Sequence, residues 1–149
     1  MISNPAELKR ILLVEDSEND IEMTLEAFSE YHLANQIDIV RDGAEALDYI
    51  FCRGAHAGRK SGPPVVVLLD IKLPKLSGIE VLREIRGDTR FAKLPVVMLT
   101  SSREEPDLRS CYALGCNAYV VKPVDFNQFT EALKILGCFW AVLNEPPLL

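Results

Sequence analysis

The sequence predicts an α/β fold: a doubly wound parallel sheet of five strands in the order 2-1-3-4-5, with five helices. Short apolar runs rich in β-branched residues alternate with amphipathic stretches along the chain. This alternation favours a mostly parallel sheet that helices cover on both faces. The second apolar run contains Asp38, which suits a strand at the edge of the sheet. Because crossovers are right-handed, few strand orders remain, and 2-1-3-4-5 fits.

The expected elements follow one another in a regular order. The strands are ILLV (11–14), IDIV (37–40), VVVLL (65–69), VVML (96–99) and AYVV (118–121). These runs have the length and the β-branched content of strands. Helices are expected where apolar residues recur at helical spacing: Ile21, Leu25 and Phe28; Ala44, Leu47 and Phe51; Ile79, Leu82 and Ile85; Leu108 and Tyr112; and Phe126, Phe129, Leu133, Leu136 and Trp140.

Length and composition predict one globular domain. The 149 residues are 48% hydrophobic and 26% charged, enough for a core of ordinary size. We expect a single domain over 1–149, with a core of about 10–136 and a C-terminal helical extension and tail at 137–149. No apolar run approaches the ~20 residues that span a bilayer, and MISNPAELKR lacks the apolar segment of a signal peptide. The expected location is therefore the cytoplasm, away from membranes.

Charge and cysteine content exclude two further classes of protein. Lys and Arg number 16 against 22 Asp and Glu, and the net charge of −6 has the wrong sign for binding nucleic-acid phosphates. We expect no direct DNA binding. The four cysteines show no CxxC spacing and there are only two histidines, so neither a zinc site nor a disulfide framework is indicated. Buried or idle free thiols are expected instead.

Polar residues that could form a site follow the first, third, fourth and fifth expected strands. They are Glu15 and Asp16 after the first strand, Asp70 after the third, Thr100 and Ser101 after the fourth, and Lys122 after the fifth. In a parallel sheet these ends share one edge, so the side chains should converge. A site of carboxylate oxygens suits Mg²⁺. Beside the metal and Lys122, Asp70 would stay ionised and act as a nucleophile on phosphorus, giving an aspartyl phosphate.

Thr100 would then hydrogen-bond a phosphoryl oxygen, and Lys122 would neutralise its charge. Each residue alone also has an ordinary explanation. Glu15 and Asp16 would cap the first helix, Lys122 would be a solvated lysine, Thr100 a strand-end hydroxyl and Asp70 a turn residue. Four such explanations at four matching strand ends are less economical than one shared site.

These residues occur in motifs that resemble the receiver domain of two-component response regulators. LLVEDSEND carries the acidic pair, LLDIKLPKLSG the phospho-acceptor loop, VVMLTSS the hydroxyl and NAYVVKP the lysine. The resemblance extends over about 10–136 and implies the flavodoxin-like receiver fold. LPKLSG, the long loop before the third strand, LGCNAYVVKPVDF and LGCFWAVLNEPP resemble more narrowly the single-domain response regulators of phytochrome-type histidine kinases.

The resemblance implies a role for each residue of the site. Asp70 would be the phospho-acceptor. Mg²⁺ would be held directly by Asp16, Asp70 and the Lys72 backbone carbonyl, and by Glu15 through water. Thr100, Lys122 and the Ser101 backbone would hold the phosphoryl group, Tyr119 would be the switch residue, and the bond before Pro123 would be cis. A sensor histidine kinase would supply the phosphoryl group. The chain would catalyse its own phosphorylation and slow dephosphorylation, and would not be an enzyme in the usual sense.

Phosphorylation would draw Thr100 toward the new charge and let Tyr119 rotate inward, as a shift between two populations. The alternative for Tyr119 is a core aromatic residue with its hydroxyl in water. Only 136–149 follow the fifth helix pattern, so output is expected through protein contacts or phosphoryl relay.

The last expected helix carries a wider apolar face than packing on one sheet requires. A second stripe, Ala132, Ile135, Phe139, Val142 and Leu143, widens the apolar face of the last helix to roughly 200°. We therefore expect a symmetric homodimer through the fourth helix, fifth strand and fifth helix, with Phe139 and Trp140 contributing. The alternative is that this segment folds back on the monomer.

Residues 52–64, before the third strand, are expected to form a solvated, mobile loop, with His56 a solvated histidine.

Three other functions compete with this interpretation. A haloacid-dehalogenase-like phosphatase needs a second acid two residues after its nucleophile, where this chain has Lys72. A nucleotide-binding or flavin-binding protein lacks support because GxxxxGK[ST] and GxGxxG are absent. A docking domain of the same fold that is never phosphorylated stays open until an assay is done.

Overall fold

A computed structural model describes residues 10–29, 36–60, 62–101, 105–122 and 125–136. The strands are β1 (Arg10–Val14), β2 (Gln36–Val40), β3 (Val66–Asp70), β4 (Val96–Thr100) and β5 (Ala118–Val121). The helices are α1 (Glu18–Ser29), α2 (Gly43–Phe51), α3 (Gly78–Gly87), α4 (Glu105–Ala113) and α5 (Phe126–Leu136), with 3₁₀ turns η2 (Gly54–His56) and η3 (Thr89–Phe91). None of the helices in these ranges is long and apolar enough to cross a membrane.

The five strands form one parallel sheet in the order β2-β1-β3-β4-β5, which confirms the predicted topology. β2, which carries Asp38, lies at an edge as expected. The third and fourth strands each run one residue further than predicted, so that Asp70 and Thr100 are the last residues of β3 and β4. Both residues are therefore fixed by strand hydrogen bonding, and every residue of β3 and β4 is buried.

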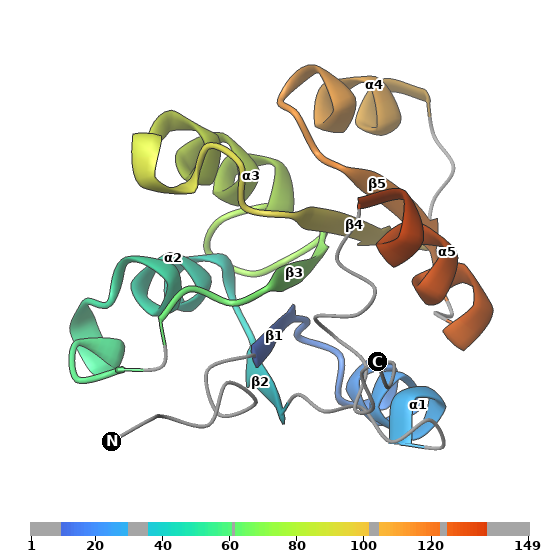
Figure 1. The fold of residues 1–149 in the computed structure, drawn as a ribbon, viewed down its shortest axis with the longest axis horizontal. Coiled ribbons are helices and arrows are strands. Elements are labelled where there is room, and N and C mark those ends of the chain that lie inside the picture. The colour runs from blue at the N-terminus through green and yellow to red at the C-terminus, as the bar shows by residue number, and fades with distance from the viewer. Residues whose placement is uncertain (1–9, 30–35, 61, 102–104, 123–124, 137–149) are drawn as a thin grey trace, which may run out of the picture.

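Helices cover both faces of the sheet (Figure 1): α1 and α5 lie on one side, and α2, α3 and α4 on the other. Each side encloses its own apolar cluster. Along β1, Leu12 and Val14 face the α2, α3 and α4 cluster, whereas Ile11 and Leu13 face the α1 and α5 cluster. The central strands are apolar at consecutive positions because helices cover both faces of the sheet and exclude water from each. Phe28 of α1 stacks on Phe129 of α5 with ring centroids 4.4 Å apart.

The helical stripes are confirmed in part. Ile21, Leu47, Leu82 and other predicted positions are buried. In α4 the predicted buried face was wrong by one residue. Tyr112, which was expected to be buried, is 51% exposed, and its neighbour Cys111 is fully buried. Cys52, Cys111 and Cys116 are free thiols, as expected, and Cys138 lies outside the described residues.

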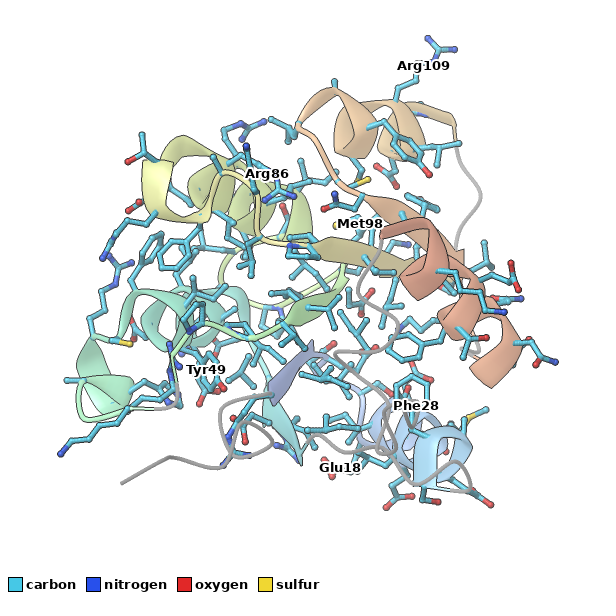
Figure 2. All side chains as sticks on the ribbon, in the orientation of Figure 1. Glu18, Phe28, Tyr49, Arg86, Met98 and Arg109 are labelled. Atoms are coloured by element: carbon cyan, nitrogen blue, oxygen red, sulfur yellow. The ribbon has the colours of Figure 1, made fainter. Side chains whose placement is uncertain are left out.

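The loop after α2 is mostly exposed, as expected, but two of its side chains pack on the protein. The Arg59 guanidinium carbon lies 4.2 Å from the centre of the Tyr49 ring, and its Nε donates to the Tyr49 carbonyl at 2.9 Å. The His56 side chain is 24% exposed, lies 3.2 Å from Glu45 and packs edge-on against Tyr49. Figure 2 labels Tyr49 at the lower left of the molecule, near α2. The expectation of a solvated His56 is therefore wrong, because the aromatic ring of Tyr49 gives the loop a surface to pack on.

Candidate functional site

Three carboxylates meet at the carboxyl edge of the sheet. Glu15 and Asp16 directly follow β1, and Asp70 ends β3. β1 and β3 are hydrogen-bonded neighbours, so the three residues share one edge. One carboxylate oxygen from each lies within 4.8 Å of the other two. Glu15 is 1% and Asp70 5% exposed, while Asp16 is exposed. Such a group repels itself unless a positive charge joins it.

That positive charge is Lys122, which follows β5. Its Nζ donates to Glu15 Oε1 at 2.7 Å, to Asp20 Oδ2 at 2.8 Å and to Asp70 Oδ2 at 3.2 Å. The Lys122 side chain is only 12% exposed. Its backbone N–H donates to the Thr100 carbonyl at 2.7 Å, which fixes the point from which the side chain reaches across the edge of the sheet. The structure therefore unites residues that are separated by up to 107 positions in the sequence.

Asp20 is a member of this cluster that the sequence reasoning missed. It lies in the first turn of α1, where its backbone N–H donates to the Ser17 hydroxyl at 3.2 Å. Ser17 is thus an N-cap, and its own N–H donates to Glu15 Oε2 at 3.2 Å. A signal for Asp20 was present: in an α/β sheet, a helix that follows a strand begins at the carboxyl edge, so an acid in its first turn lies near the site.

Burial and charge act together on the site. Burial raises the pKa of Glu15 to about 7; the hydrogen bond from Lys122 opposes this rise, and Asp70 adds to it. Burial lowers the pKa of Lys122, but its hydrogen bonds to Asp20 and Glu15 and the charge of Asp70 outweigh burial, so this pKa lies above its ordinary value. Lys122 therefore stays charged at neutral pH. The acids outnumber the ammonium, and the site keeps an affinity for further positive charge.

The loop after Asp70 is held from two sides. The Ile71 N–H donates to the Leu99 carbonyl at 3.2 Å, and the Gly78 N–H donates to the Ile71 carbonyl at 2.8 Å. Gly43 at the start of α2 donates to the Pro74 carbonyl at 3.2 Å. Lys72, whose backbone carbonyl was predicted to be a metal ligand, lies in this loop with its side chain exposed.

The hydroxyl side of the site is formed by the end of β4. Thr100 is 2% exposed, and Ser101 follows it at the surface. The Tyr119 hydroxyl is buried, so the alternative in which it reaches water is wrong. Burial raises the pKa of Tyr119, and the nearby Thr100 hydroxyl opposes the rise. Within the described ranges, however, no group meets hydrogen-bond geometry with the Tyr119 hydroxyl.

Three predicted residues fall outside the part of the chain that the structure describes. Pro123, with its expected cis bond, and Phe139 and Trp140, expected at a dimer surface, lie outside the described residues. The described part of the chain does bring together Glu15, Asp16, Asp70 and Lys122, with Thr100 and Ser101 on the same edge.

Known proteins resemble this chain over nearly its whole length. The family model for the response regulator receiver domain matches residues 11–134. The solved structure of the bacteriophytochrome response regulator AtBRR is 56% identical, with a TM-score of 0.84, and the match covers 93% of this chain and 99% of that one. The bacteriophytochrome response regulator RtBRR is also 56% identical, with a TM-score of 0.83 and coverage of 93% and 84%.

A third relative is the response regulator Rcp1 of Synechocystis sp. (strain ATCC 27184 / PCC 6803 / Kazusa). It is 35% identical over 138 residues, which are 93% of this chain and 91% of Rcp1. A solved structure of Rcp1 in its Mn²⁺-bound form has a TM-score of 0.74 to this chain, with 32% identity and coverage of 94% and 99%. From the family match, the shared topology and these relatives, this chain belongs to the response regulator receiver domain family of two-component signalling.

Proposed function

We propose that the chain is a single-domain response regulator that accepts a phosphoryl group on Asp70, with Mg²⁺, from a phytochrome-type sensor histidine kinase in the cytoplasm. The contact of Lys122 with both Glu15 and Asp70, at 2.7 and 3.2 Å, carries this proposal. It places a cation beside the carboxylate that would become phosphorylated. The identity of 56% to two bacteriophytochrome response regulators supports the type of kinase.

The transfer would be a displacement at phosphorus. An Asp70 carboxylate oxygen forms the new O–P bond while the P–N bond of a phosphohistidine breaks, and the imidazole nitrogen keeps the electron pair. Lys122, the Thr100 hydroxyl and the Ser101 backbone N–H would take up charge on the phosphoryl oxygens. Burial of Asp70, at 5% exposure, limits the approach of competing water.

The donor set fits a hard divalent cation. Its three carboxylates each offer an oxygen within 4.8 Å of the others, and such oxygen ligands suit Mg²⁺. Asp16, Asp70 and the Lys72 carbonyl would hold the ion directly, and Glu15 would act through water. When bound, the ion neutralises these charges and orients a phosphoryl oxygen. The Mn²⁺-bound structure of Rcp1 supports a divalent cation in a relative.

The response would reach the protein surface through Thr100 and Tyr119. Movement of Thr100 toward the phosphoryl group would leave space for Tyr119, whose buried hydroxyl stands near it and has no hydrogen-bond partner among the described residues. The Tyr112 ring lies 6.4 Å from the Tyr119 ring and is half exposed, so a rotation would change the surface of α4. A homodimer through α4, β5 and α5 would sense this change. The net charge of −6 supports output without direct DNA binding.

Intact mass spectrometry tests the chemistry. The chain is incubated with Mg²⁺ and a small-molecule phosphodonor, beside an Asp70→Asn variant, an EDTA-treated sample and an Asp48→Asn control. Asp48 is a distant acid on α2 that pairs with Arg53 at 3.1 Å. We expect one added phosphoryl group for the wild-type and control chains, and none for the other two samples. Phosphorylation of the Asp70→Asn chain would contradict the proposed acceptor.

The kinase is tested by comparing transfer rates. A phosphorylated phytochrome-type kinase should donate to the chain much faster than a histidine kinase with an unrelated sensor. Equal rates would contradict the phytochrome link and leave the chemistry at Asp70 intact.

A further inference from the structure

We infer that Asp20 is a positioning residue for Lys122: Asp20 holds the Lys122 ammonium group when a divalent cation neutralises the charge of Glu15 and Asp70. The inference deepens the proposed function, because it rests on the Mg²⁺ site. All three N–H donors of Lys122 are directed at carboxylates, of which Asp20 is the second nearest at 2.8 Å. Asp20 lies outside the group of three acids that could share a metal ion.

Lys122 and a divalent cation depend on the same two carboxylates. Both carboxylate oxygens of Glu15 accept a hydrogen bond: Oε2 from the Ser17 N–H and Oε1 from the Lys122 ammonium group. Asp70 accepts Lys122 on Oδ2. A divalent cation that binds at Asp70 Oδ1 and, through water, at Glu15 would neutralise the charge that holds Lys122, and so would weaken the attraction of both acids for the ammonium group.

Asp20 gives the ammonium group an acceptor that the cation does not claim. Without Asp20, Lys122, which is 12% exposed, would keep only the two carboxylates whose charge the cation neutralises. A nearly buried charge without partners is costly. With Asp20 present, Lys122 keeps one charge-assisted bond. The cation therefore binds more tightly, and the ammonium stays near Asp70, where a phosphoryl group would need it.

The position of Asp20 suits this task. The Ser17 cap fixes the first turn of α1, from which Asp20 projects. The Asp20 side chain is 34% exposed, so its carboxylate is partly hydrated and tolerates the changes in charge around it. Glu18 in the same turn offers a natural comparison, because it points instead to Arg41, at 2.9 Å, and is well exposed (Figure 2). An effect on the helix dipole alone would be shared by both acids.

A double-mutant cycle on Mg²⁺ affinity tests the inference. Isothermal titration calorimetry measures the dissociation constant of Mg²⁺ for the wild-type chain and for Asp20→Asn, Asp20→Glu and Glu18→Gln. It then repeats the Asp20→Asn comparison in a Lys122→Met background. We expect Asp20→Asn to weaken binding by roughly five- to tenfold and Glu18→Gln by less than about twofold, with recovery in Asp20→Glu. In the Lys122→Met background, Asp20→Asn should change the affinity by less than about twofold.

Two results would overturn the inference. Asp20→Asn could leave the Mg²⁺ affinity unchanged, or it could lower it equally in both backgrounds, which would mean that Asp20 acts as a distant charge without Lys122. Thermal unfolding of each variant checks its fold, and Asp20→Glu, which keeps the charge, serves if Asp20→Asn is unstable. Mg²⁺ binding does not need phosphoryl transfer, so a chain that binds Mg²⁺ without being phosphorylated refutes only the proposed function. A wild-type chain that binds no Mg²⁺ refutes both.

Discussion

Replacement of Gly78 by alanine should disturb the site through the backbone. Gly78 is the first residue of α3, and its N–H donates to the Ile71 carbonyl at 2.8 Å. A Cβ at this position would lie 2.9 Å from the Asp70 carbonyl carbon and 2.9 Å from the Ile71 Cα, and closer still to the Asp70 carbonyl oxygen. These are backbone atoms, so the conflict has no cheap side-chain solution, and the chain at Asp70 has to move.

The size of the effect follows from two opposing contributions. Overpacking that forces backbone shifts costs about 1–3 kcal/mol. Alanine also restricts the unfolded chain and favours a helix, which stabilises the protein by roughly 0.4–1 kcal/mol. We therefore expect Gly78→Ala to lower the free energy of unfolding by about 1–2 kcal/mol. Because the shift begins at Asp70, the Mg²⁺ affinity and the yield of phosphorylated protein should fall as well.

Gly87→Ala is the matched control. Gly87 is the last residue of the same helix, and a Cβ there would meet no atom within 4 Å. Urea unfolding of both variants gives their free energies of unfolding, and calorimetry gives their Mg²⁺ affinities. The control should be as stable as the wild-type chain or slightly more stable. If Gly78→Ala matched Gly87→Ala in stability and in Mg²⁺ affinity, the steric argument would be refuted.

Two further predictions concern charged groups. In metal-free buffer the pKa of Glu15 is about 7 against an ordinary value of 4.5, so the folded state holds this proton more tightly than the unfolded state. Its stabilising contribution is complete below about pH 4.5 and is lost as the pH rises through about 7. Urea unfolding in EDTA should show a decline of about 3 kcal/mol in the free energy of unfolding over this pH range, which Glu15→Gln lacks. Parallel pH profiles of the two chains would contradict this. Arg86 on α3 (Figure 2) donates to the Gly115 carbonyl at 3.0 and 2.9 Å and to Asn117 Oδ1 at 2.9 Å. Arg86→Met should destabilise the chain by about 2 kcal/mol and the exposed Arg83→Met by under ~0.5 kcal/mol, and equal effects in thermal or urea unfolding would show that these bonds contribute little.

The predicted site was found because it follows from the topology. Once strands are parallel, the residues after ILLV, VVVLL, VVML and AYVV must lie along one edge, whatever their side chains do. Glu15 and Asp70 therefore meet through the pairing of β1 with β3. The first turn of α1 indicated an acid near the site, but it holds two, Glu18 and Asp20, and the sequence does not report which of them turns toward the edge of the sheet.

The fold class, the strand order, the edge position of β2 and the meeting of Glu15, Asp16 and Asp70 could all be predicted from the sequence. These predictions depend on the spacing of apolar and polar residues along the chain and on the rules that connect parallel strands. Three features became visible only in the folded chain: Asp20 shares Lys122, Arg59 and His56 pack on Tyr49, and α4 buries Cys111 in place of Tyr112. These outcomes depend on distances between side chains of different elements, such as the 2.8 Å from Lys122 to Asp20 across 102 residues of sequence.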